Sequence, residues 1–217
     1  MMKHLLAVAL LLAPLSSCAT TSASYVPPRL PNQQTDWSRS IQKPFDEVWE
    51  ALIDHASGTF FAIDNFEKES GLLTLSFGGS RLDRFVDGGD WEYNESSGMD
   101  PMTGRTVGAD VEFDGNYATF LQQYRTASFT GKMNIFVRDQ GGWSTEVKVR
   151  ARYVVTSSVF TGGRVATNIW SFDTGGFDTV HVSGAVKGTE PSRTLRPTHK
   201  AERSVLEAIE SFGRSTE

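Results

Sequence analysis

The clearest pattern in the chain is the alternation of apolar and polar positions between residues 127 and 157. Two runs, 127–138 and 143–157, are separated by Asp-Gln-Gly-Gly, which predicts two long β-strands joined as a hairpin. The apolar positions of the second run are Val147, Val149, Ala151, Tyr153 and Val155. The alternate positions carry Glu146, Lys148, Arg150 and Arg152. This pattern is typical of an antiparallel sheet with one face in the core and the other face solvated and charged.

Residues 45–56 show helical spacing. Pro44 suits a first helical turn, Asp46 and Glu47 lie where the helix dipole favours acids, and Gly58 follows the expected end. The apolar face of this predicted helix consists of Phe45, Val48, Trp49, Leu52, Ile53 and Ala56.

A second helix is predicted at the C-terminal end of the chain. Thr198 is a plausible N-cap and Gly213 a plausible stop. The apolar stripe between them consists of Ala201, Val205, Ala208, Ile209 and Phe212.

Shorter runs predict further strands at 37–41, 59–66 and 72–77, and a weaker strand pair at 166–172 and 177–182. The order predicts an α+β fold: an antiparallel β-sheet with an N-terminal and a C-terminal helix packed on one face, in a helix-grip-like arrangement. Residues 78–126 are rich in Gly and Asp without a sustained period, with candidate short strands at 85–86, 91–93 and 110–113. We expect an irregular segment that is either mobile or carries a surface function.

The N-terminal residues predict a secretory signal, with Lys3 and His4 before an apolar run at 5–12. Leu15-Ser16-Ser17-Cys18 resembles the lipobox of bacterial lipoproteins. The resemblance implies cleavage of a signal peptide at 1–17 and attachment of lipid to Cys18, which anchors the chain in a membrane. Because Ala19 and not Asp follows, the resemblance implies the outer membrane, with the protein facing the periplasm. The alternative is a cysteine that happens to end an ordinary signal peptide.

Composition limits the remaining possibilities. The 217 residues are 39% hydrophobic and 22% charged, which is an ordinary globular balance. The polar, proline-containing composition after Cys18 predicts a flexible tether, so that 18–35 comprises the cysteine that the resemblance implies is lipidated and this tether, and 36–217 forms a single α+β domain. A net charge of −5 with no basic run argues against nucleic acid as a partner, and one cysteine excludes an internal disulfide.

Motifs for catalysis are missing from the sequence. There is no Gly-x-Ser-x-Gly and no phosphate-binding loop. His55, His181 and His199 are too far apart in sequence to form a helical zinc pair. Five acids, Asp83, Asp87, Asp90, Glu92 and Glu95, lack the spacing of a calcium loop, although a carboxylate pair for glycoside cleavage stays open. We therefore expect no enzyme, no catalytic residue, no cofactor and no metal.

Two pieces of the sequence resemble a known group. Lys43-Pro44-Phe45-Asp46-Glu47-Val48-Trp49 and Glu69-Ser70-Gly71-Leu72-Leu73, within 41–77, look like the small repeated domains of BamC-type (NlpB-type) lipoproteins. The segment 201–209 is similar to the last helix of envelope lipoproteins of this style. The resemblance covers about a quarter of the chain and implies a non-enzymatic domain that contacts an envelope protein partner.

A second hypothesis is a carrier of a small hydrophobic ligand. A helix-grip sheet can enclose a cavity between the sheet and its long helix. In that case Phe129, Phe136 and Tyr153 are the aromatic residues expected at the ligand.

Overall fold

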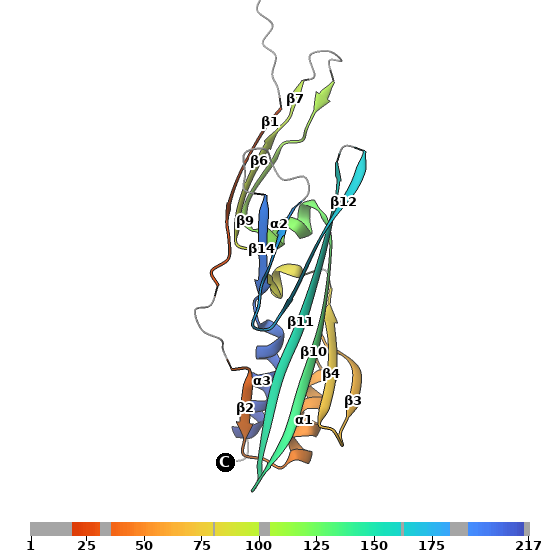
Figure 1. The fold of residues 1–217 in the computed structure, drawn as a ribbon, viewed down its shortest axis with the longest axis vertical. Helices are drawn as coiled ribbons and strands as arrows, with labels where there is room; N and C mark the ends of the chain where they lie inside the picture. Colours follow the sequence, from red (N-terminus) through yellow and green to blue (C-terminus); the bar gives the residue numbers. More distant parts are fainter. Residues whose placement is uncertain are drawn as a thin grey trace, which may run out of the picture.

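The computed structural model describes residues 19–30, 36–79, 81–99, 105–161, 163–182 and 191–214. Its centre is a sheet of order β12-β11-β10-β4-β3, with β2 paired to the lower half of β11 (Figure 1). The strands are β2 (Ser38–Ile41), β3 (Ala62–Glu67), β4 (Leu72–Gly78), β10 (Thr126–Gly141), β11 (Ser144–Thr161) and β12 (Arg164–Asp173). Every pairing in this sheet is antiparallel, as the alternation of residues 127–157 predicts.

Helices α1 (Phe45–Ser57) and α3 (Lys200–Arg214) pack against each other and against the same face of this sheet. Val48 and Leu52 of α1 and Val205 and Ile209 of α3 are fully buried there. The predicted α+β class, with an N-terminal and a C-terminal helix on one face of an antiparallel sheet, is confirmed.

The expected ends of α3 are wrong. Thr198 does not cap the helix, because its hydroxyl donates to the carbonyl of Arg84 at 2.7 Å. His199, with φ +60°, directly precedes the helix and accepts from the amide of Arg203. Gly213 lies inside the helix, where a Cβ would come within 3.2 Å of Ile41, so the glycine allows close packing and does not end the helix.

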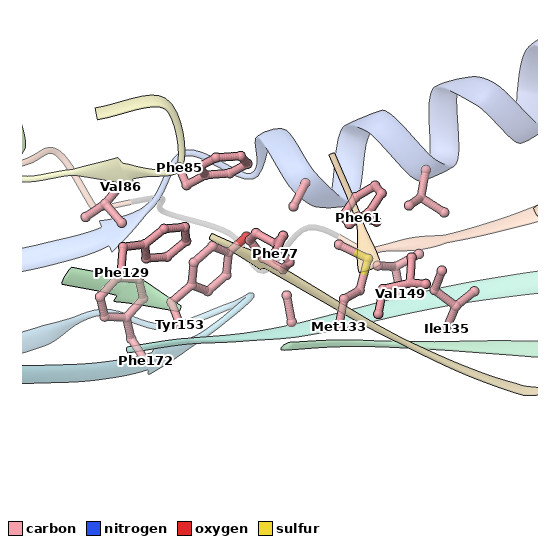
Figure 2. Packing of buried hydrophobic residues seen from close by; sticks show 14 of the residues in the cluster. Phe61, Phe77, Phe85, Val86, Phe129, Met133, Ile135, Val149, Tyr153 and Phe172 are labelled. Atoms are coloured by element: carbon pink, nitrogen blue, oxygen red, sulfur yellow. The ribbon is translucent and has the colours of Figure 1, made fainter. Parts of the chain in front are cut away.

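The core between sheet and helices is aromatic at one end and largely aliphatic at the other (Figure 2). Gly131 lies between Phe77 and Tyr153, its direct neighbours on β4 and β11. The missing side chain makes room for the Phe77 ring, which contacts the ring of Tyr153 edge to face at a centroid distance of 5.6 Å. The rings around this pair are Phe61, Phe85, Phe129 and Phe172.

A second, smaller sheet has the order β1-β6-β9 and lies toward the other end of the molecule (Figure 1). Its strands are β1 (Thr20–Val26), β6 (Asp90–Ser96) and β9 (Val111–Asn116), and β9 leads directly into helix α2 (Tyr117–Tyr124). The expectation of a flexible tether over 18–35 is therefore wrong for Thr20–Val26. Seven residues of β1 pair with β6, and this ladder compensates for the low apolar content of the strand.

The irregular segment expected at 78–126 is also largely structured. Besides β6, β9 and α2 it holds the 3₁₀ turn Leu82–Arg84 and the short strands β5 (Val86–Asp87), β7 (Gly98–Met99) and β8 (Thr106–Val107). Strand β14 (Ser192–Pro197) pairs with β5 and with β13 (Asp178–His181). The strand expected at 177–182 thus exists, but it pairs with β14 and not with β12.

A buried cation joins the small sheet to β14. Arg193 is 1% exposed, and its guanidinium carbon lies 4.4 Å from the ring centre of Trp91, 4.5 Å from that of Tyr25 and 5.5 Å from that of Tyr117. The Tyr25 hydroxyl donates to the Thr194 carbonyl, and the Thr194 amide donates back to that hydroxyl. Strand β1 is therefore part of the packed fold.

Candidate functional site

The outer face of the main sheet, which the helices leave uncovered, carries a concentration of positive charge. On the β10–β11 hairpin the outward positions include Lys132, Lys148, Arg150 and Arg152, while the intervening residues point into the core. This distribution follows directly from the two-residue period of the strands. Four cations on one hairpin face contrast with a chain whose net charge is −5.

Two of these cations are direct neighbours. Lys132 and Arg152 stand opposite each other in the β10–β11 register, an arrangement that destabilises a sheet when nothing compensates it. Lys132 is 3.4 Å from a carboxylate oxygen of Asp64, and Arg152 donates to the Ser171 hydroxyl at 3.1 Å. The like charges are thus only partly compensated within the protein.

The other two cations are open to solvent or to a ligand. Within the part of the chain that the structure describes, Lys148 and Arg150 form no ion pair and no side-chain hydrogen bond. The cross-strand neighbours of these two residues, Phe136 and Asn134, carry no charge. An anion that binds here would therefore meet two cations without an existing partner.

A groove of about 720 Å³ lies along these side chains. One wall is formed where β2 and β12 leave a gap along the edge of β11. Trp37 and Thr174 flank that gap, and the Thr174 hydroxyl accepts from the amide of Ala151 at 2.6 Å. The Thr174 amide donates to the Ala151 carbonyl at 2.9 Å, which holds this wall in place. Asp36 and Asp173 are the two carboxylates that line the groove.

A second hollow of about 850 Å³ continues from the first. The two hollows adjoin at Lys132 and Arg152, which line both of them on the outer face. The lining beyond the shared cations is mainly apolar, with Phe60, Val154 and the edge of Phe129. Together the two hollows offer cations where they adjoin and an apolar surface at one end, a combination that fits an extended chain with acidic and aromatic side chains.

Directly behind the groove wall lies a buried polar cluster. The Tyr153 hydroxyl donates to a carboxylate oxygen of Glu202 at 2.5 Å, and both side chains are fully buried. Burial and the Glu202 carboxylate raise the pKa of Tyr153, so this hydroxyl stays protonated and remains a donor. His199 Nδ1 is 3.6 Å from the other oxygen of Glu202, and the imidazole stacks on Trp37 at 4.5 Å. Because Tyr153 and Glu202 have no access to solvent, we assign the cluster a structural role.

The acids singled out from the sequence do not converge. Asp83 pairs with Arg81, and Glu95 accepts from the Tyr93 hydroxyl. Asp87 accepts from Arg196 and from Asn116. Among the described residues no group of three or more His, Cys, Asp or Glu side chains could hold a metal ion.

The three histidines also lie apart. His55, in the last turn of α1, is 3.2 Å from the Ser204 hydroxyl, His181 is exposed on β13, and His199 precedes α3. Burial lowers the pKa of His55, which disfavours a charge at that position.

The aromatic residues expected at a hydrophobic ligand do not line one common cavity. Phe129 and Tyr153 are buried in the packed core, whereas Phe136 is half-buried on the outer face. Met133, Ile135 and Val149 fill the space toward the other end of the core (Figure 2). The described interior between sheet and helices is therefore occupied by side chains of the protein.

Sequence reasoning found only part of the groove. The alternation of β11 indicated a charged face with Lys148, Arg150 and Arg152. It did not indicate that Trp37 and Thr174, more than 100 residues apart in sequence, would border that face, because the gap between β2 and β12 depends on strand pairing. Cys18, the predicted lipidation site, lies outside the described residues.

Comparison with protein-family models, with curated proteins and with solved structures found no match for this chain. Among the described residues no helix has the length and apolar character needed to cross a membrane.

Proposed function

We propose that this protein is a non-enzymatic lipoprotein of the bacterial outer membrane, anchored through lipid on Cys18, whose outer sheet face binds an acidic segment of an envelope protein partner. The observation that carries the partner chemistry is the groove in which Lys148 and Arg150 form no ion pair with the described residues. Charged surfaces of this kind give binding its speed and its selectivity.

The anchoring part of the proposal rests on the resemblance of residues 15–18 to a lipobox. Two or three acyl chains on one cysteine make membrane attachment effectively permanent. Cys18→Ala removes the only cysteine, so a processed variant should leave the membrane fraction. Fractionation with detergent partitioning measures this, with wild type as the control. Processed Cys18→Ala protein that stays in the outer membrane would contradict the lipoprotein assignment.

The groove is tested with a double charge reversal, Lys148→Glu with Arg150→Glu. The matched control is Arg84→Glu with Arg105→Glu, which changes the net charge equally at exposed positions away from the groove. A fluorescent poly-L-glutamate peptide is the probe, and its binding to the mature protein is followed by anisotropy. We expect the groove variant to lose about tenfold in affinity and the control to bind like wild type.

The same pair of variants identifies the natural interaction. A photo-crosslinking residue at position 134, between the groove cations, should capture one envelope protein in stoichiometric amount from cells that carry the wild-type or control chain. Capture should be lost with the groove variant and should weaken as salt rises, because exposed charges are screened. Equal capture by the groove variant and the control would rule out the groove as the binding surface.

A further inference from the structure

The distance between Cys18 and the folded protein is short. Strand β1 begins at Thr20, only two residues after Cys18, and two residues span at most about 7 Å. Ala19 already lies beside Gly108, next to strand β8, since a Cβ on that glycine would be 3.5 Å from the Ala19 Cβ. Lipid on Cys18 would therefore hold this end of the small sheet against the bilayer surface.

The β11–β12 hairpin points toward the same end of the molecule. Figure 1 shows the start of β1, the β7 strand and the free end of this hairpin in the same half of the molecule, with β1 and β7 extending further along the long axis than the hairpin. The turn between β10 and β11 lies at the opposite end, together with the C-terminal helix. An anchor at Cys18 thus orients the elongated molecule and brings the hairpin end toward the membrane.

The outer face of this hairpin end has a different character from the groove. Along β11 the outward residues change from charged ones at 146–152 to uncharged ones at 154–160. At the end of the hairpin Phe160 and Val165 stand directly opposite each other, and they are 73% and 67% exposed. Ile169, 56% exposed, lies on the same face of β12. Exposed apolar clusters on soluble surfaces mark contact sites.

From these observations we infer that the end of the β11–β12 hairpin inserts its apolar side chains into the lipid surface that holds the Cys18 anchor. Phe160 and Val165 enter the boundary between headgroups and acyl chains, a region where apolar side chains of peripheral proteins bind. The exposed Arg164 next to them suits the anionic headgroups at that depth. The inference rests on the anchoring part of the proposed function.

Two membrane contacts have a consequence for the groove. With one contact at Cys18 and another at Phe160, the long axis of the molecule is tilted toward the hairpin side and the molecule cannot rotate freely about its anchor. Lys148 and Arg150 lie on β11 between the hairpin end and the far turn, so the groove faces the periplasmic space and stays clear of the bilayer.

The test uses the single cysteine for a chemical anchor. The mature chain from Cys18 onward is coupled to maleimide-bearing lipid in vesicles of phosphatidylcholine and phosphatidylglycerol that contain brominated acyl chains. Phe160→Trp places a reporter at the hairpin end. Phe66→Trp is the matched control, because Phe66 is 64% exposed on β3 of the main sheet. The fluorescence of each added tryptophan is obtained as the difference from the parent protein.

We expect the bromolipids to quench the tryptophan at position 160 with a blue shift of its emission, and to leave the tryptophan at position 66 unquenched. Equal quenching at both positions would mean that the molecule lies flat, and no quenching at position 160 would mean that the hairpin stays in water. Either result overturns the inference. Matching far-ultraviolet circular dichroism of both variants shows that they are folded. Because the anchor is attached chemically, these results do not depend on lipidation in cells, which the Cys18→Ala fractionation decides separately.

Discussion

The main sheet and the small sheet bury their inner faces with different chemistry. The main sheet is covered by α1 and α3 and packs phenyl rings and aliphatic chains, among them Phe77 over Gly131. The small sheet packs Tyr25 and Trp91, together with Tyr117 of α2, around the guanidinium of Arg193. The first arrangement depends on shape and volume, whereas the second also depends on one charge. Stability should therefore respond to a change of side-chain volume in the main core and to the removal of a charge beside the small sheet.

The largest effect is expected in the main core at Gly131. In Gly131→Ala the new Cβ would lie 2.3 Å from a ring atom of Phe77, and neighbouring rings leave Phe77 no free space. Overpacking of this kind should lower the free energy of unfolding by about 3 kcal/mol. Urea unfolding followed by circular dichroism measures the change. Gly176→Ala is the control, because its nearest atoms lie at 3.7 Å, and an unchanged midpoint for Gly131→Ala would contradict the packing described for this core.

The centre of the small sheet is tested by Arg193→Met, which keeps a long side chain and removes the charge. The loss of the cation–π contacts and of the hydrogen bond to the Ser192 carbonyl should cost about 2 kcal/mol. Hydrogen exchange should become faster at the amides of β1 and β6 and stay unchanged in the middle of β10 and β11. A Met variant as stable as wild type would show that packing alone holds this region together.

High pH acts on both regions, because burial raises the pKa of Tyr153 in the main core as well as the pKa of Tyr117 beside Arg193. The Tyr117 ring lies beside the Arg193 guanidinium. Burial raises the pKa of Tyr117 from an ordinary value of 10 to about 12. The unfolded chain releases this proton near pH 10 and the folded chain does not, so stability is complete below pH 10 and falls as the pH rises toward 12. The contribution of Tyr117 to the free energy of unfolding that is lost over that window is at most about 2.7 kcal/mol.

Tyr117→Phe should therefore flatten the loss of stability between pH 9 and about pH 12, and urea midpoints at several pH values measure it. Tyr124→Phe serves as the control, because Tyr124 is exposed on the same helix. If both variants lose stability with pH as steeply as wild type, Tyr117 does not contribute to this dependence.

The smallest effect is expected at Asp87 of β5, which joins Arg196 of β14 to Asn116 at the end of β9. Although burial opposes ionisation, hydrogen bonds from Gly89 and Asn116 and the Arg196 guanidinium lower the pKa of Asp87 below its ordinary 3.8. Its stabilisation is complete above pH 3.8 and is lost as the pH falls through the lower folded pKa.

Asp87→Asn should cost about 1 kcal/mol at neutral pH, because one ion pair is removed. The difference from wild type should shrink once the solution is more acidic than the folded pKa. Thermal unfolding at neutral pH and at a pH below the folded pKa of Asp87 tests this. The exposed Asp90→Asn is the control. A difference that persists unchanged in acid would mean that the charge of Asp87 has no part in it.

The two regions also differ in how far the sequence predicted them. The hairpin of the main sheet was predicted because one face of each strand is buried, so that apolar residues such as Val147 and Val149 recur at every second position. Helices α1 and α3 were predicted for the corresponding reason at helical spacing. The same alternation indicated that Lys148, Arg150 and Arg152 share an exposed face.

The small sheet was predicted only as isolated short strands at 91–93 and 110–113, without β1 and without the pairing that joins them. Strand β1 carries only Ala23, Tyr25 and Val26 as apolar residues, and its hydrogen-bonding partner β6 lies about 70 residues further along the chain. The local sequence of β1 does not indicate with which strand it pairs. The polar composition of 18–35 therefore predicted a tether, although Tyr25 is needed beside Arg193.

The sequence by itself determined the α+β class, the two helices on one sheet face and the charged outer face of the hairpin, because periodicity alone decides which side chains are buried. Only the tertiary structure decided that β1 starts two residues after Cys18, that Trp37 and Thr174 border the cationic groove, and that Arg193 is enclosed by aromatic rings. These features bring together residues that are distant in the chain. They depend on strand pairing and packing, which no local pattern specifies.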